Sequence, residues 1–132
     1  MAKFAGITVL DGGSDLIRTL AGTASRVKMH LIKAYTAGDA YATVVTTNGL
    51  GSIDMVAADF VQSGASNRAT TVAAKVITLT ASSGAGPNLH IAIVDSVSSA
   101  VLLVTDETSD QVVTSGNTFS VPAWAYTVSQ PV

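Results

Sequence analysis

The sequence predicts an all-β protein. Ala, Val, Thr and Ser supply 67 of the 132 residues, and a chain so rich in small and β-branched side chains favours pleated sheet over helix. Short apolar runs separated by Gly, Asn, Asp and Ser recur through the second half of the chain, as expected for strands joined by turns. The length is that of one domain, so residues 1–132 are expected to fold around one hydrophobic core.

Helical signals are confined to two places. Ser14 is a candidate cap for a short helix over residues 15–21, which Gly22 would end. Residues 53–62 fit one face of a helix preceded by Ser52, while the strands expected nearby favour more sheet, so both assignments stay open.

The clearest strand signal lies over residues 26–36. Apolar and basic side chains alternate there in the order Arg26, Val27, Lys28, Met29, His30 and Leu31. This period of two predicts a half-buried strand with a basic outer face. Further along, Asn48-Gly49 suits a tight turn, so residues 41–47 and the segment after Leu50 are expected to form a hairpin.

The second half contains evenly spaced short strands. The expected runs are residues 76–81, 89–94, 100–105, 111–113 and 118–129. Pro122 interrupts the last run and cannot donate a backbone hydrogen bond, so a bulge or an edge position is expected there. Strands of this spacing predict a β-sandwich, jelly-roll-like or immunoglobulin-like, with one or two short helices.

Composition excludes several classes of function. The net charge of −2 and the seven aromatic residues give no basic, base-stacking surface, so no nucleic-acid partner is expected. The absence of cysteine excludes disulfides, thiolate zinc sites and cysteine nucleophiles. No apolar run approaches 18 residues and the N-terminus does not resemble a secretion signal, so neither a membrane partner nor processing is expected.

Charge is scarce and unevenly distributed. Charged residues make up 12% of the chain, with a net charge of +3 over residues 1–36 and −4 over residues 76–132. The two groups either cancel inside the fold or leave opposite patches that copies or partners could match. A neutral surface of small residues is removed from water at little electrostatic cost, so much of the exterior is expected to be covered in an assembly.

No catalytic or cofactor-binding constellation stands out. His90 lies in an apolar run with Asp95 nearby, but no Gly-x-Ser-x-Gly elbow is present and the spacing does not orient an imidazole, so a structural or surface histidine is expected. His30 is likewise expected at the surface, and two histidines 60 residues apart show no metal-ligand spacing. The chain is therefore predicted not to be an enzyme.

Oxygen ligands and aromatic rings offer two weaker signals. The acidic residues of segments 106–110 and 11–15 lack the ligand spacing of a calcium loop, so they are expected to keep turns solvated, and no metal is predicted. Trp124 and Tyr126 could form a platform for a sugar or a partner, although an indole near a C-terminus more often belongs to a core or an interface.

A set of short motifs in residues 55–131 resembles a group of small virion proteins of tailed bacteriophages. The motifs are AADF at 57–60, RATTVAAKV at 68–76, HIAIVD at 90–95, LVT at 103–105, TSGN at 114–117 and VPAW at 121–124. The resemblance implies a β-sandwich structural protein of the phage particle, with a head decoration or cement protein as the expected type. It implies no catalytic residues.

The expected function is thus a non-enzymatic subunit that binds the outside of a capsid shell and stabilises it by bridging capsomers. The expected partners are the major capsid protein and further copies of this chain, with a trimer as one expected assembly. The protein is expected to be made in the host cytoplasm and to end on the capsid surface of the virion. A tail or fibre component and a carbohydrate-binding β-sandwich module are the alternatives. The candidate interface residues are Arg26, Lys28, His30, Trp124, Tyr126 and Val128.

Overall fold

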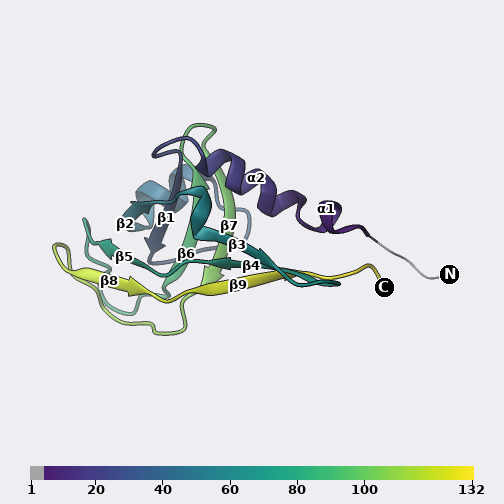
Figure 1. Ribbon diagram of the computed structural model, residues 1–132. Helices are drawn as coiled ribbons and strands as arrows, with labels where there is room; N and C mark the ends of the chain where they lie inside the picture. The colour runs from purple at the N-terminus through teal and green to yellow at the C-terminus, as the bar shows by residue number, and fades with distance from the viewer. Residues whose placement is uncertain (1–4) are drawn as a thin grey trace.

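The computed structural model describes residues 5–132 (Figure 1). Two α-helices open this part of the chain, α1 (Ile7–Leu10) and α2 (Gly12–Ala21). The strands are β1 (Val27–Ile32), β2 (Gly49–Asp54), β3 (Phe60–Ser63), β4 (Arg68–Val72), β5 (Lys75–Thr78), β6 (His90–Asp95), β7 (Ala100–Asp106), β8 (Thr118–Val121) and β9 (Trp124–Val128). A π-helical turn, η1 (Thr43–Thr47), and a 3-10 turn, η2 (Ala57–Asp59), lie between strands.

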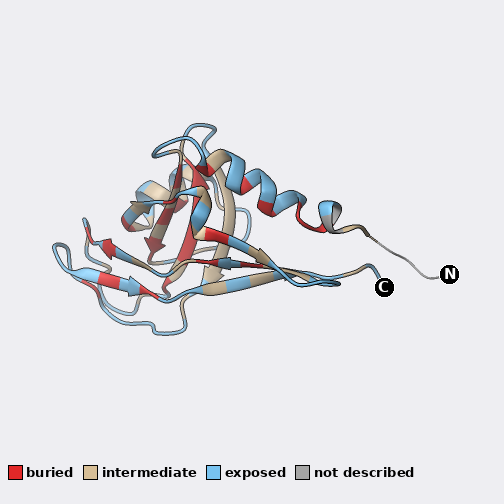
Figure 2. Cartoon of the chain, viewed as in Figure 1, coloured by how far each residue is buried: buried red, intermediate tan, exposed pale blue. Residues whose placement is uncertain are grey.

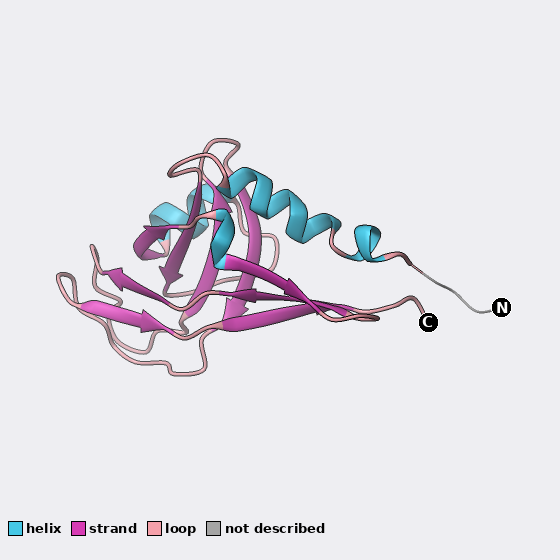
Figure 3. Cartoon of the chain, in the orientation of Figure 1, coloured by secondary structure: helices cyan, strands magenta, loops and turns pink. Residues whose placement is uncertain are grey.

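The strands form three antiparallel sheets. The first has the order β2-β1-β6-β7, the second β3-β4-β9 and the third β5-β8. Figure 3 shows that strands dominate the chain and that α2 lies on the side of β3 and β4. The prediction of an all-β fold is confirmed, and the layering is sandwich-like.

The second and third sheets share one long two-stranded ribbon. Residues 68–72 pair with 128–124 and residues 75–78 pair with 121–118, in a register that continues unchanged across the gap. Pro122 lies in that gap, where its missing N–H interrupts the ladder. The expected run 118–129 is therefore two strands, β8 and β9, on one edge of the ribbon, and we call β4–β5 with β8–β9 the ribbon.

The main core fills the space between the four-stranded sheet, the ribbon and α2 (Figure 2). Met29 and Ile93 enter it from the four-stranded sheet, and Phe60 and Phe119 enter it from the other two sheets. α2 closes one side with Ile17. Apolar side chains from every sheet thus meet in one buried cluster, which the alternation of the strands directs inward.

A second buried cluster covers the opposite face of the four-stranded sheet. Val44 of η1 packs there with Ile32, Ala92 and Val94. The hairpin expected over residues 41–47 is wrong for this reason, because a helical turn places apolar side chains of one face on the sheet. Asn48-Gly49 leads from η1 into β2, and a Cβ at Gly49 would lie 2.2 Å from the carbonyl oxygen of Val45.

The N-terminal helix differs from its prediction at one end. α2 ends at Gly22 as expected, where the Gly22 N–H donates to the carbonyls of Arg18 and Thr19. It begins at Gly12, and Ser14 lies buried inside its first turn and does not cap it. Asp11 precedes the helix without capping it, because its carboxylate binds Arg68.

Most of the other expected strands lie close to their predicted residue ranges. The strand expected at 26–36 is the shorter β1, and residues 53–62 contain the end of β2, η2 and most of β3. Residues 111–113 are not a strand: the Val113 N–H donates to Ser83 Oγ at 3.0 Å, and the Ser83 N–H donates to the Val113 carbonyl at 3.0 Å. β4 was not predicted as a strand.

Replacement of Phe60 by Ala should destabilise the protein strongly. Its side chain is 1% exposed where the second sheet joins the core, and truncation leaves a cavity worth about 3–5 kcal/mol of unfolding free energy. Urea unfolding provides the measurement. The neighbouring Val61, 59% exposed on the same strand, is the control, and Val61→Ala should change stability by less than about 0.5 kcal/mol. Equal losses in both variants would contradict this packing.

Candidate binding interface

The basic residue at the start of β1 is engaged inside the fold. The Arg26 guanidinium donates two hydrogen bonds to Asp95, from Nε to Oδ1 at 3.0 Å and from Nη2 to Oδ2 at 2.8 Å. Asp95 is buried, and the Arg26 pair, with a hydrogen bond from Ser98, holds the pKa of its carboxyl well below the usual range. Arg26 is therefore a structural cation that neutralises a buried carboxylate.

Three further cations, Lys28, Arg68 and Lys75, also form ion pairs. Lys28 binds Asp54 on the adjacent strand β2, and this hydrogen bond, together with one from Ser25, lowers the pKa of Asp54. Two further ion pairs join Arg68 to Asp11 at 2.9 Å and Lys75 to Asp59 at 2.8 Å. Of these four ion pairs, Arg26–Asp95 alone joins the basic segment 1–36 to the acidic segment 76–132, and each of the other three involves a residue of the middle of the chain.

His30 is half-buried rather than at the open surface. It lines a polar hollow of about 240 Å³ with Val45, Ser52 and Thr80, beside the turn η1. Burial, and next the positive charge of Lys28, lower the pKa of His30 to about 4. The imidazole is consequently neutral at neutral pH and adds no charge to the face of β1.

His90 and Asp95 do not form a catalytic pair. They occupy opposite ends of β6, and Asp95 is bound to Arg26. The His90 ring has its Nδ1 3.0 Å from the Asn88 carbonyl and its Nε2 3.7 Å from Asp106, and it contacts the ring of Tyr35. These contacts give His90 a structural environment at the end of the sheet.

The acidic turns are occupied by local hydrogen bonds. Asp110 Oδ1 accepts the Leu89 N–H at 2.7 Å, and Glu107 Oε1 accepts the Ser109 N–H at 3.2 Å. Within residues 5–132 no three His, Cys, Asp or Glu side chains gather where they could hold a metal ion. The carboxylates of Asp110 and Glu107 thus accept hydrogen bonds from backbone N–H groups.

An extended uncharged surface lies on the ribbon and the adjoining β3. Because side chains alternate along a strand, the neighbours of the inward residues must point outward. The outward residues, all exposed except the half-buried Ala69, are Val61, Ser63, Ala69, Thr71, Val76, Thr78, Thr118, Ser120, Ala125 and Thr127. We call this set the outer ribbon face. None of its members is charged, and all are small or β-branched.

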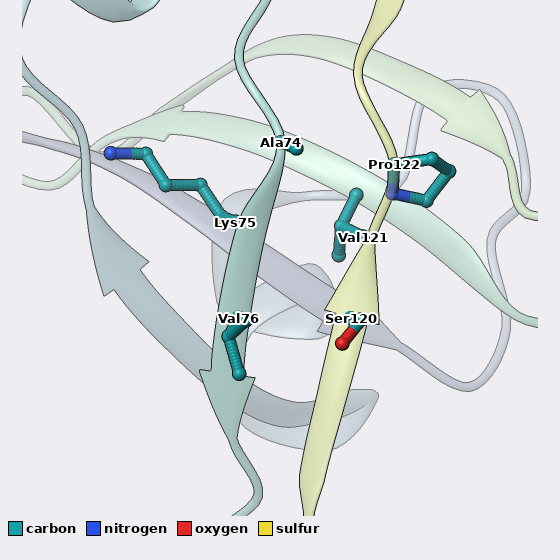
Figure 4. A pocket seen from close by; sticks show the side chains of 6 residues that line it. All are labelled: Ala74, Lys75, Val76, Ser120, Val121 and Pro122. Atoms are coloured by element: carbon teal, nitrogen blue, oxygen red, sulfur yellow. The ribbon is translucent and has the colours of Figure 1, made fainter.

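A shallow apolar hollow of about 320 Å³ marks the gap in the ribbon (Figure 4). It is lined by Ala74, Lys75, Val76, Ser120, Val121 and Pro122. Lys75, its one charged lining residue, already binds Asp59. Figure 4 shows that the lining side chains come from both strands of the ribbon, so the hollow is a break in a sheet and not an enclosed ligand cavity.

The three apolar candidates share β9 but point inward. Trp124 lies opposite Val72 and packs against the main core, and Tyr126 lies opposite Thr70. Val128, at the end of the strand, is 39% exposed. The indole Nε1 and the Tyr126 hydroxyl are buried without a hydrogen-bond partner. The polar atoms of both rings are therefore not available to a ligand at the surface.

The structure places the sequence-predicted residues in two separate regions. Arg26, Lys28 and His30 belong to the first sheet near its charge pairs, whereas Trp124, Tyr126 and Val128 belong to the ribbon. The outer ribbon face was not predicted from the sequence. Its signal was the alternation of Thr, Ser, Ala and Val without charge, which becomes a surface only once the strand register is known.

Comparisons with protein-family models, with curated proteins and with solved structures find no match to this chain. Over the described residues, no helix has the length and apolar character needed to span a membrane. The interpretation of function therefore depends on the surfaces of the fold and on the motif resemblance.

Stability should fall as the pH decreases from about 6.5 to about 4, because of His30. An unfolded imidazole has a pKa of 6.5 and the folded one has a pKa of about 4, so the unfolded state binds more protons over this window. The fall should amount to about 2–3 kcal/mol. Urea unfolding at several pH values measures it. His30→Gln should flatten this part of the profile and His90→Gln should not; an unchanged profile in His30→Gln would refute the assignment.

Tyr126→Phe should leave the fold intact and raise the free energy of unfolding by about 1 kcal/mol. The substitution removes a buried hydroxyl that lacks a hydrogen-bond partner, and such a group costs about 1–3 kcal/mol. Thermal and urea unfolding give the measurement. Tyr41→Phe, which changes a half-buried tyrosine of the second cluster, serves as the control and should be nearly neutral. A loss of stability in Tyr126→Phe would show that the hydroxyl has a bonded partner.

Proposed function

We propose that this protein is a non-enzymatic structural subunit of a tailed-phage particle, a decoration or cement protein that binds the outer surface of the capsid shell. The observation that carries the proposal is the outer ribbon face, which extends over two sheets without a charged residue. The motif resemblance in residues 55–131 supports the same class of protein.

The size of the outer ribbon face suits protein contact. Eleven residue positions on each ribbon strand span about 37 Å at 3.4 Å per residue. The face carries small hydroxyl and methyl groups, and no ion has to lose its hydration when it is covered. A neutral and extended face fits a broad protein surface better than a small ligand.

A capsid shell offers many identical binding sites, so each single contact can be weak. A capsid presents the same site many times, and a subunit that touches two capsomers forms its later contacts at high effective concentration. Stabilisation then comes from bridging, with modest affinity at each contact. The proposed partners are accordingly the major capsid protein and neighbouring copies of this chain, on the outside of the virion.

Arg26 and Lys28 were expected to contact a partner, but both form ion pairs within the fold, with Asp95 and Asp54. We therefore propose that they stabilise the fold and contribute little to docking. Charge reversal at Arg26 would mainly leave a buried carboxylate unpaired. Docking is therefore better tested on the outer ribbon face than on β1.

Binding to shells that lack this protein tests the proposal. The purified chain should bind such particles and raise the temperature at which they release their contents. Thr71→Lys, in the middle of the outer ribbon face, should weaken binding at least tenfold, or about 1.4 kcal/mol, because the ammonium would be desolvated.

Val97→Lys is the matched control, since Val97 is 69% exposed in the turn between β6 and β7, at the other end of the molecule from the ribbon in Figure 1. It should bind as the unmodified chain does. If the unmodified protein neither binds the shells nor protects them from heat, the cement function is wrong. Binding to isolated tails instead would assign it to the tail or fibre.

A further inference from the structure

We propose that β9 pairs edge to edge with β9 of a second copy of this chain, so that two three-stranded sheets join into one. This inference rests on the proposed function, in which copies of the chain lie side by side on a shell. It names the surface through which neighbouring copies associate. It concerns the edge of the ribbon, whereas docking on the shell uses the outer ribbon face.

β9 is the outermost strand of the sheet β3-β4-β9. One side of β9 pairs with β4 from residue 124 to residue 128. Along its other side no strand of residues 5–132 is hydrogen-bonded to it. Figure 1 shows β9 running along the lower border of the molecule. An edge of this kind presents backbone N–H and C=O groups that template a further strand.

Pro122 protects this edge before β9 begins, but β9 itself carries neither a charge nor a proline. Natural edge strands are blocked by lysines, prolines, bulges or covering segments. The sequence of β9 is WAYTV. Three other borders differ: β2 is bridged to Leu79 of the chain after β5, β7 ends in Asp106, and Gln62 of β3 is bonded to α2 through Arg18. β8, with the sequence TFSV, is a second uncharged outer strand on the same side of the ribbon as β9.

The sequence of β9 is compatible with its own copy. A two-fold antiparallel pair centred on Tyr126 places Ala125 opposite Thr127 of the second copy and Trp124 opposite Val128 of the second copy. Aromatic and β-branched cross-strand pairs stabilise a sheet, and like charges directly opposite each other destabilise it. The nearest cation on the strand β4, Arg68, is neutralised by Asp11. Charge therefore opposes no register of this pair.

The contact area of the proposed pair is small, so pairing should be more complete on a shell than in solution. Five paired residues span about 17 Å, and a sheet is about 10 Å thick, so the junction is smaller than a standard interface. Free copies should therefore pair weakly. Copies held side by side on a shell meet at high effective concentration and should pair far more completely.

Cysteine cross-linking tests the junction, because the chain contains no cysteine of its own. Ala125→Cys copies mixed with Thr127→Cys copies bring two Cα atoms within about 5.5 Å in the proposed pair, inside disulfide range. The matched control replaces Ala125→Cys by Thr71→Cys, which lies beside Ala125 on the same face but on the inner strand β4.

Under mild oxidation, in concentrated solution and on shells, the 125/127 mixture should yield at least tenfold more disulfide-linked dimer than the 71/127 mixture. Equal yields in the two mixtures would overturn β9 pairing. Shell binding by the unmodified protein is measured separately, so a failure of the proposed function is distinguishable from a failure of this inference.

Discussion

The two strands of the ribbon keep one register along their whole length, and both the core and the outer ribbon face follow from it. On each strand the inward positions change phase at the same place, from Val72 to Lys75 on one and from Val121 to Trp124 on the other. Because the phase of the inward side chains changes on both strands together around Pro122, the strands stay paired. The apolar side chains of both strands therefore face the core on both sides of the change. One core can therefore extend beneath two sheets, and one uncharged face can extend over them.

The ion pairs and the uncharged outer ribbon face both follow from the antiparallel order of the strands. The acids and bases that the sequence separates are brought together by the antiparallel order, Arg26 with Asp95 at the end of β1 and β6, and Lys28 with Asp54 across β1 and β2. Charges satisfied in this way add little to long-range fields. The outer ribbon face is then distinguished by shape and neutrality, properties that suit extended contact with a large partner.

Sequence reasoning predicted the elements with a strong period and missed those decided by tertiary packing. Alternation located β1, and apolar runs located β6 and β7. Asn48-Gly49 indicated a tight hairpin, but Val44 is drawn onto the sheet by a helical turn, which no local rule of turn chemistry reveals. Ser14 failed as a cap because the helix begins earlier. The outer ribbon face could not be predicted, since its members come from five strands whose register is a long-range property.

In the proposed function, the outer ribbon face lies against the capsid shell. Image reconstruction of shells saturated with the purified protein tests it most directly, at a resolution that separates the ribbon from the four-stranded sheet. We expect the outer ribbon face of β4, β5, β8 and β9 to point toward the shell, with the turn that contains Val97 facing solvent. A bound molecule with the ribbon facing solvent and the four-stranded sheet or α2 against the capsomers would contradict it.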